Sequence, residues 1–404
     1  MKSLILTAGF FPAVFFNNNN AASNHKSKPM TATTQRFTAL DVFRGMTVCL
    51  MIIVNTPGNG NTIWSPLHHA AWHGFTPTDL VFPSFLFAVG NAMSFVMKKW
   101  ETLPQSTVVW KILKRTFIIF LLGYLMYWFP FVKWGAGNTL VGFPFGETRV
   151  FGVLQRIALC YGIAALMIYF FKPKAALIIS IILLFLYWIL LYAFGDAADP
   201  LSMQGNFGSV IDRWLLNEKH LYHGEGVAFD PEGLLSTMPA VANVVAGYMV
   251  GKYIQEKGNS YEGLTKLLLT GSLLLFAAYC INLSFPINKK LWTSSFVLHT
   301  VGLDCIIISV IIYIINFKQK TNWTYFFEVF GRNPLFIYLL SELGATLLYF
   351  FRADPKTTLY QWIYTNIFSH AGDYFGSFLF ALSVMLFCWL VGYVLDKRKI
   401  YVRV

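Results

Sequence analysis

The stretch PLHHAAWHGFTPTDLVFPSFLFAVGNAM, residues 66–93, decides the fold that we expect for this chain. It begins with a polar loop that holds His68, His69 and His73, and it continues past Asp79 into an apolar run. A run of about 20 apolar residues is long enough to cross a bilayer as a helix. The stretch therefore predicts a transmembrane helix with titratable side chains at one membrane boundary.

The composition of the 404 residues extends this prediction to the whole chain. Hydrophobic residues make up 56% and charged residues 12%, whereas about a quarter of a soluble domain is charged. The net charge is +12, but Lys and Arg occur in short clusters between apolar runs, which is typical of topology signals and not of a nucleic-acid site. We therefore expect an all-α, polytopic membrane protein that contacts membrane lipid and has no nucleic-acid partner.

Apolar runs of about 20 residues predict ten transmembrane helices. Their expected ranges are 37–56, 79–97, 112–129, 150–171, 175–194, 233–252, 263–283, 293–316, 325–350 and 374–395. Lys and Arg are concentrated in one set of connections, which the positive-inside rule assigns to the cytoplasm. Both termini are then cytoplasmic, and the loop with His69 lies on the outer face. We expect residues 1–35 to form a disordered leader and residues 36–404 to form a single membrane domain.

The cysteines do not indicate a disulfide framework or a zinc site. All five lie in apolar runs without CxxC spacing, so we expect them to be small core residues: Cys49, Cys160, Cys280, Cys305 and Cys388.

The first predicted span carries charged and amide side chains. Asp41 and Arg44 are three residues apart, so they share a helix face and can form an ion pair, which lowers the cost of placing them near lipid. The pair is either structural or functional. Asn55 ends the span near the outer face, where its amide either caps the helix or donates to an oxyanion.

The histidine-rich loop favours acid–base chemistry. Three histidines within six residues, next to Trp72 and Asp79, are more than a lone interfacial histidine would explain. The HHxxxH spacing matches no metal-ligand pattern, so no metal is expected. Acid–base catalysis by one of the histidines is the favoured interpretation.

Further polar residues lie inside the apolar runs. Each is compatible with local packing, but together they suggest a polar interior, because each polar group exposed to hydrocarbon would cost several kcal/mol. They are Gln155, Arg156, Asn243, His299, Asp304, Arg332, Asn333 and Glu342.

Several motifs resemble one known family. LDVFRG (40–45), VN (54–55) and HAAWHGFTPTDLVFPSFLFAVG (69–90) resemble the transmembrane acyltransferases related to heparan-α-glucosaminide N-acetyltransferase. Shorter pieces follow in the order seen in that family: RVFGVLQRI, FDPEGLLST, INKKLWTSSFVL and GRNPLFIY. The resemblance covers nearly the whole chain from Phe37 onward, and its long motif is specific.

The resemblance implies an enzyme that moves an acetyl group from cytosolic acetyl-CoA to the amine of a glucosamine-type sugar or glycan end on the outer side. It implies that His69 is the catalytic histidine, as general base or acetyl acceptor, and that Asn55 acts with it. Asp79 belongs to the same motif, where it either fixes the tautomer of His69 or caps the second span. A short form of this kind is expected in a cell inner membrane, and the family suggests a homodimer.

The acetyl-CoA phosphates require cations. The expected inner face supplies Lys98, Lys99, Lys111, Lys114 and Arg115, and we add Arg44 from the LDVFRG motif. We place Asp41, Trp72, His73 and the polar residues of the spans at the substrate or in the polar interior. The alternative function is a permease for N-acetylglucosamine-type amino sugars, but the two halves of the chain show no inverted repeat of the kind that many transporters contain.

Overall fold

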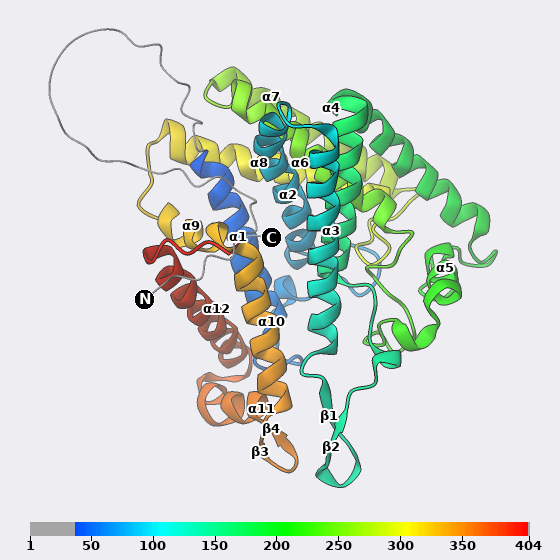
Figure 1. Cartoon of the computed structure of the whole chain (residues 1–404), viewed down its shortest axis with the longest axis vertical. Coiled ribbons are helices and arrows are strands. Elements are labelled where there is room, and N and C mark those ends of the chain that lie inside the picture. The colour runs from blue at the N-terminus through cyan, green and yellow to red at the C-terminus, as the bar shows by residue number, and fades with distance from the viewer. Residues whose placement is uncertain (1–36, 403–404) are drawn as a thin grey trace, which may run out of the picture.

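The computed structural model describes residues 37–402, which fold mainly into helices (Figure 1). The helices are α1 (Thr38–Asn55), α2 (Val81–Trp100), α3 (Gln105–Trp128), α4 (Val153–Phe194), α5 (Phe207–Leu216), α6 (Thr237–Lys257), α7 (Tyr261–Asn282), α8 (Ser294–Ile312), α9 (Thr324–Arg332), α10 (Pro334–Phe350), α11 (Leu359–Ile363) and α12 (Asp373–Lys397). The strands form two short hairpins, β1 (Val132–Trp134) with β2 (Leu140–Gly142) and β3 (Arg352–Asp354) with β4 (Thr357–Thr358). The expected leader, residues 1–35, lies outside the described residues.

The described helices make this a multi-pass membrane protein. Six are long and apolar enough to cross a membrane, or seven if the bent pair α9 and α10 forms one span. Each of the ten predicted ranges overlaps a helix, although α3 and α6 are not among those six. The number ten and the cytoplasmic side of the termini stay predictions.

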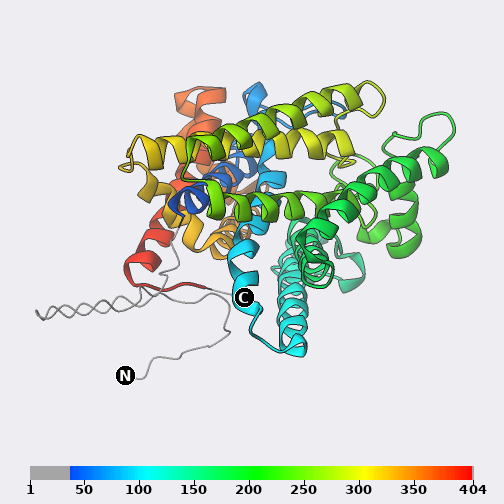
Figure 2. The ribbon, with the colours of Figure 1, turned by 90° about the horizontal axis from the view of Figure 1, so that it is seen from above.

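Two predicted spans, 150–171 and 175–194, are the halves of one element, α4. Lys172 adopts a φ of 66° immediately before Pro173, which interrupts the helix there. Proline supplies no backbone N–H and crowds the preceding turn, so a helix bends or breaks at this point. The second half of α4 leads to α5 on the side of the molecule opposite to α12 (Figures 1 and 2).

The predicted span over 325–350 is not one continuous helix. The chain bends by 81° between α9 and α10. Asn333 leaves the helical region with φ −129° and ψ 49°, and Pro334 begins α10. Because the residue before a proline is disfavoured in helical geometry, the Asn333–Pro334 pair ends one helix and starts the next.

Helix α2 lies in the interior and packs against α1, α6 and α8. It approaches α6 through glycines: Gly90 of α2 faces the backbone of Val244, and Gly247 of α6 faces the backbone of Phe87. Small residues allow membrane helices to approach closely. This contact fixes α2, and with it the loop that enters α2 from His69.

The two hairpins lie beside each other at the lower end of Figure 1. Trp134 donates from Nε1 to the carbonyl of Phe350 at 2.9 Å, and the Arg352 guanidinium lies 4.5 Å from the Trp134 ring centre. The hairpins therefore join the end of α3 to the end of α10.

Four of the five cysteines are buried as expected, but Cys280 is exposed on α7. The expectation of a core position was wrong for this residue, because the apolar face of α7 on which it lies points away from the protein interior.

Candidate active site

The loop before α2 is held in one conformation by its own polar side chains. The hydroxyl of Thr76 donates to the carbonyl of His68 at 2.6 Å, and that of Thr78 donates to the carbonyl of Pro66 at 3.0 Å. The Asp79 carboxylate accepts the Thr76 backbone N–H at 3.0 Å, which caps the short 3-10 helix Pro77–Leu80. The loop is therefore a preformed element.

Asp79 also binds His69. Its Oδ1 lies 2.7 Å from Nδ1 of His69, while Oδ2 accepts the backbone N–H of Ala70 at 3.1 Å. The carboxylate is fully buried, whereas the His69 side chain is 44% exposed. A carboxylate at Nδ1 favours the tautomer that carries its proton there, so Nε2 is left as the basic nitrogen. The two roles considered for Asp79, cap and histidine partner, are both present.

Lys289 lies against the same imidazole. Its Nζ is 2.9 Å from Nδ1 and 3.1 Å from Nε2 of His69, and 3.7 Å from the Asp79 carboxylate. It comes from the connection between α7 and α8, far from His69 in sequence. The site is thus a histidine between a buried carboxylate and an ammonium group.

Burial and the charge of Lys289 favour the neutral form of His69. Burial lowers the pKa of the His69 imidazole, and the positive charge of Lys289 lowers it further, while Asp79 opposes both effects. Burial also lowers the pKa of the Lys289 ammonium, although Asp79 and Glu232 favour its charged form. A neutral, partly exposed imidazole with a fixed tautomer can accept a proton from a substrate.

The turn that carries Lys289 is anchored by Trp292. This indole is 1% exposed, its Nε1 donates to Oδ1 of Asn243 at 3.1 Å, and the Arg156 guanidinium lies 5.0 Å from its ring centre. Arg156 in turn donates to the carbonyl of Gly233 at 2.9 Å. Asn243 and Arg156, which were predicted for a polar interior, therefore contact Trp292 and so help to hold the turn that carries Lys289.

Trp72 and His73 connect the loop to its surroundings. Trp72 donates from Nε1 to the carbonyl of Leu201 at 3.1 Å and meets Phe229 edge-on at 5.6 Å. The Asn288 amide donates to Nδ1 of His73 at 3.3 Å. Both residues lie at the site, and their observed contacts are with the connections that join α4 to α5, α5 to α6 and α7 to α8.

Further charged side chains lie near Lys289 and pair with one another. Arg149 pairs with Asp230 and with Glu232, each at 2.6 Å. Glu232 is close enough to favour the charged form of Lys289. Lys290 pairs with Glu225 at 2.7 Å and donates to the carbonyl of Ala71 at 3.0 Å. Acidic and basic side chains therefore pair with one another around Lys289 and Lys290.

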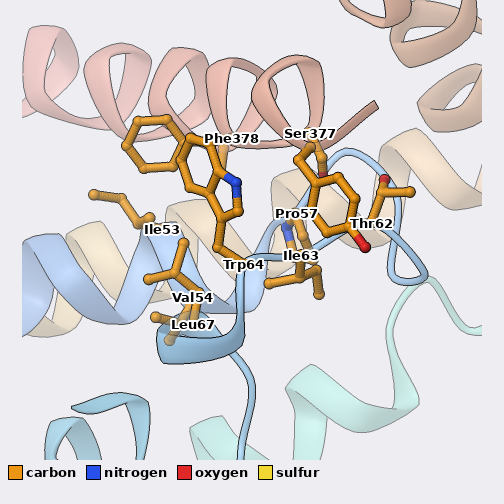
Figure 3. A pocket seen from close by; sticks show the side chains of 11 residues that line it. Ile53, Val54, Pro57, Thr62, Ile63, Trp64, Leu67, Ser377 and Phe378 are labelled. Atoms are coloured by element: carbon orange, nitrogen blue, oxygen red, sulfur yellow. The ribbon is translucent and has the colours of Figure 1, made fainter. Parts of the chain in front are cut away.

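Asn55 ends α1 and pairs with α10. Its amide donates to Oε1 of Glu342 at 3.0 Å. Figure 3 shows that Val54, the preceding residue, lies next to Leu67, at the start of the histidine loop, in a small apolar pocket that Trp64 and Phe378 also line. The end of α1 and the histidine loop are thus neighbours, with Asn55 directed to α10.

Four predicted residues lie around the bend between α9 and α10 and connect neighbouring segments. Asp41 and Arg44 form the expected ion pair at 2.8 Å, and Arg44 also donates from Nε to the carbonyl of Gly331 at 2.8 Å. Arg332 pairs with Asp396 at 2.6 Å. Asn333 accepts the backbone N–H of Val402 at 2.9 Å. These contacts join α1 and α12 to the bend between α9 and α10.

Three more side chains of the predicted polar interior are buried on α4 and α8. Gln155 is fully buried at the start of α4. Asp304 of α8 accepts a hydrogen bond from Ser84 of α2, and the His299 ring lies 4.4 Å from that of Phe75. None of these contacts reaches His69 directly.

The cationic side chains expected to bind the CoA phosphates lie at the end of α2 that is far from His69. Lys98 and Lys99 are exposed in the last turn of α2, and Lys114 is exposed on α3. Arg115 is partly buried, with its guanidinium 4.7 Å from the Tyr161 ring centre. A helix of 20 residues is about 30 Å long. Cations and histidine are thus separated by the thickness of a membrane.

Residues 37–402 contain no group of three or more His, Cys, Asp or Glu side chains that could hold a metal ion. The chemistry available at the described site is that of imidazole, carboxylate, ammonium and amide groups.

Sequence reasoning missed Lys289, Trp292 and Glu232 as members of the site. Their signal was present, because they lie in the motif fragments INKKLWTSSFVL and FDPEGLLST. The residues were not assigned because nothing in local sequence shows that the connection between α7 and α8 folds onto the histidine loop.

Comparisons with known proteins relate the chain to one family. The family model for heparan-alpha-glucosaminide N-acetyltransferase, catalytic, matches residues 36–266. The mouse heparan-alpha-glucosaminide N-acetyltransferase is 26% identical over 460 residues, covering 96% of this chain and 65% of the mouse protein. The human protein of the same name is 24% identical over 437 residues, covering 93% and 61%. The chain thus spans less than two thirds of the length of these relatives, and the matched region contains His69, Asp79 and Glu232. Because the family model matches more than half of its length, the chain belongs to the family of heparan-alpha-glucosaminide N-acetyltransferase catalytic domains.

Proposed function

We propose that the protein is a transmembrane N-acetyltransferase that moves an acetyl group from acetyl-CoA to the amine of a glucosamine-type sugar. The observation that carries the proposal is the arrangement of His69 between Asp79 at 2.7 Å and Lys289 at 2.9 Å. Membership in the family, and the names of the mouse and human relatives, support the choice of acetyl transfer and of an amino sugar.

In the proposed reaction His69 acts as the general base. The acceptor ammonium first loses a proton, because only the free amine attacks a thioester carbonyl. A C–N bond forms, the C–S bond breaks, and the amine gives up a second proton. Nε2 of His69 accepts a proton and passes it to the leaving CoA sulfur, so the products are the amide, the CoA thiol and one released proton.

The site's other groups have matching roles. Asp79 holds the proton of His69 on Nδ1 and stabilises the imidazolium that forms during transfer. Lys289 adds to the effect of burial in lowering the pKa of the resting imidazole. Because its ammonium lies 3.1 Å from Nε2, the acceptor has to displace it before that nitrogen can take a proton.

The donor is proposed to enter from the opposite face. Lys98, Lys99 and Lys114 supply exposed cations for the CoA phosphates at the end of α2 distant from His69. If α2 crosses the membrane, these cations lie on the cytosolic side when the His69 loop lies outside. The residues present therefore fit an acetyl-CoA phosphate group, and we propose a location in a cell inner membrane.

The experiment is acetyl transfer from radiolabelled acetyl-CoA to glucosamine by the purified protein in detergent. Loss of one general base typically lowers the rate by about 10²- to 10⁴-fold, so His69→Ala should reduce labelling of the sugar to that extent. His370→Ala, which alters an exposed histidine near the start of α12, is the matched control. Transfer at the wild-type rate by His69→Ala would overturn the assignment, and binding of N-acetylglucosamine without transfer would favour the permease.

A further inference from the structure

Glu342 of α10 is an acidic side chain without a cationic partner among residues 37–402. Its carboxylate accepts the Asn55 amide at 3.0 Å. Within residues 37–402, no Lys or Arg forms an ion pair with it, although Arg149, Arg332 and Lys289 all pair with other carboxylates. An ionisable side chain in a membrane helix is costly and usually indicates a functional site.

The position of Glu342 makes it reachable by a ligand. Glu342 is partly exposed, and Asn55, at the end of α1, is exposed. A carboxylate directed into lipid would be strongly unfavourable, so the exposed part of this side chain is expected to contact water or a polar ligand. The site is therefore an accessible acceptor of positive charge near one end of α1 and α10.

Aromatic and charged groups connect this carboxylate with the histidine site. Tyr127 of α3 lies within electrostatic range of both Glu342 and Glu232, and its ring packs 5.0 Å from the Arg149 guanidinium. Glu232 in turn acts on Lys289, which contacts His69. A chain of aromatic and charged side chains thus leads from the surroundings of Glu342 to those of His69.

The end of α1 is the second connection between them. Val54 precedes Asn55 and shares the pocket in Figure 3 with Leu67, two residues before His69. A ligand held by Asn55 and Glu342 would therefore lie next to the histidine loop.

We propose that Glu342 and Asn55 form the binding site for the acceptor's ammonium group, which deepens the proposed function by assigning the residues that recognise a protonated amino sugar. The carboxylate pairs with the ammonium, and the Asn55 side-chain oxygen accepts one of its hydrogens. The uncharged amide product has no ammonium to pair with Glu342, so it binds less tightly and leaves.

The test measures binding without catalysis. Glucosamine, glucose and N-acetylglucosamine are titrated into the purified protein in detergent without acetyl-CoA, and dissociation constants are measured by isothermal titration calorimetry. Because glucose replaces the ammonium by a hydroxyl, the wild type should bind glucosamine about tenfold or more tightly than either neutral sugar.

Glu342→Gln should remove this preference, and Glu342→Asp should retain part of it. Glu147→Gln, which removes a carboxylate that pairs with Lys133 on an exposed loop, controls for the change in net charge. Equal binding of glucosamine and glucose by the wild type, or an unchanged preference in Glu342→Gln, would overturn the inference. The wild-type transfer assay judges the proposed function separately, because acetyl transfer can persist when the ammonium site is assigned wrongly.

Discussion

His69 is the residue whose chemistry depends most on its immediate neighbours. Asp79 fixes the tautomer, and burial together with Lys289 lowers the pKa of the imidazole. Asp79 alone would raise that pKa by favouring the imidazolium. The lysine therefore matters because it offsets the carboxylate and keeps the base available at lower pH.

Lys289→Met should move the acid limb of the kcat/KM profile for the acceptor to higher pH. The charge of Lys289 lowers the pKa of His69 in the enzyme without acceptor, so its removal raises that pKa. The base form is lost as the pH falls through the pKa, so the loss of activity then begins at higher pH. The measurement is kcat/KM for the acceptor against pH at saturating acetyl-CoA, because this ratio reports the pKa of the enzyme before the acceptor binds.

Lys133→Met, at an exposed pair with Glu147, is the control and should leave the profile in place. A Lys289→Met profile that superimposes on the wild type would show that Lys289 does not control the protonation of His69.

At the scale of elements, glycine contacts decide how closely helices cross. A Cβ on Gly45 of α1 would collide with the carbonyl of Phe327 in α9, and one on Gly331 would collide with the carbonyl of Asp41. These two glycines also place Arg44 against the carbonyl of Gly331. The LDVFRG motif, of which Gly45 is the last residue, thus has a packing role in this structure.

Gly45→Ala should destabilise the protein, by about 1–3 kcal/mol if the helices separate only partly. The measurement is thermal unfolding in detergent, with yield after solubilisation as a second reading. Gly344→Ala is the matched control, because it lies in α10 with nothing within 4 Å of an added Cβ. If the two variants unfold at the same temperature, the close contact of α1 with α9 is not needed.

Hydropathy predicted the positions of helices well, because apolar length is a local property. The breaks were harder to predict: the apolar run over 325–350 continues through the bend, and only the Asn333–Pro334 pair marks it. The site was predicted in part for a similar reason. His69 and Asp79 are ten residues apart, and a contact between them was one of the two roles considered for Asp79 from the sequence. Lys289, in contrast, reaches them through a contact between distant parts of the chain that Trp292 anchors.

On the scale of the whole molecule, α2 joins two different chemical environments. Its first turn follows the His69 loop, and its last turn carries exposed Lys98 and Lys99. The proposed function uses both ends, with CoA phosphates at one and the amine at the other. The two substrates should therefore respond to different sets of mutations.

The double variant Lys98→Ala, Lys99→Ala should raise the KM for acetyl-CoA while leaving the KM for glucosamine unchanged. Loss of two charge-assisted phosphate contacts should weaken apparent affinity by about tenfold or more. Initial rates with each substrate varied in turn provide the measurement. Lys318→Ala, Lys320→Ala in the connection before α9 is the control for lost positive charge. A rise in the KM for glucosamine alone would contradict the proposed location of the donor.

Acetyl transfer across a sealed membrane tests the central claim most directly. Glucosamine is enclosed in proteoliposomes with the wild type or His69→Ala, labelled acetyl-CoA is added outside, and N-acetylglucosamine is measured inside. Molecules whose Lys98 end faces outward should label the enclosed sugar, and His69→Ala should label almost none. Labelling only when both substrates are on the same side, or equal labelling by His69→Ala, would contradict transfer through the membrane by His69.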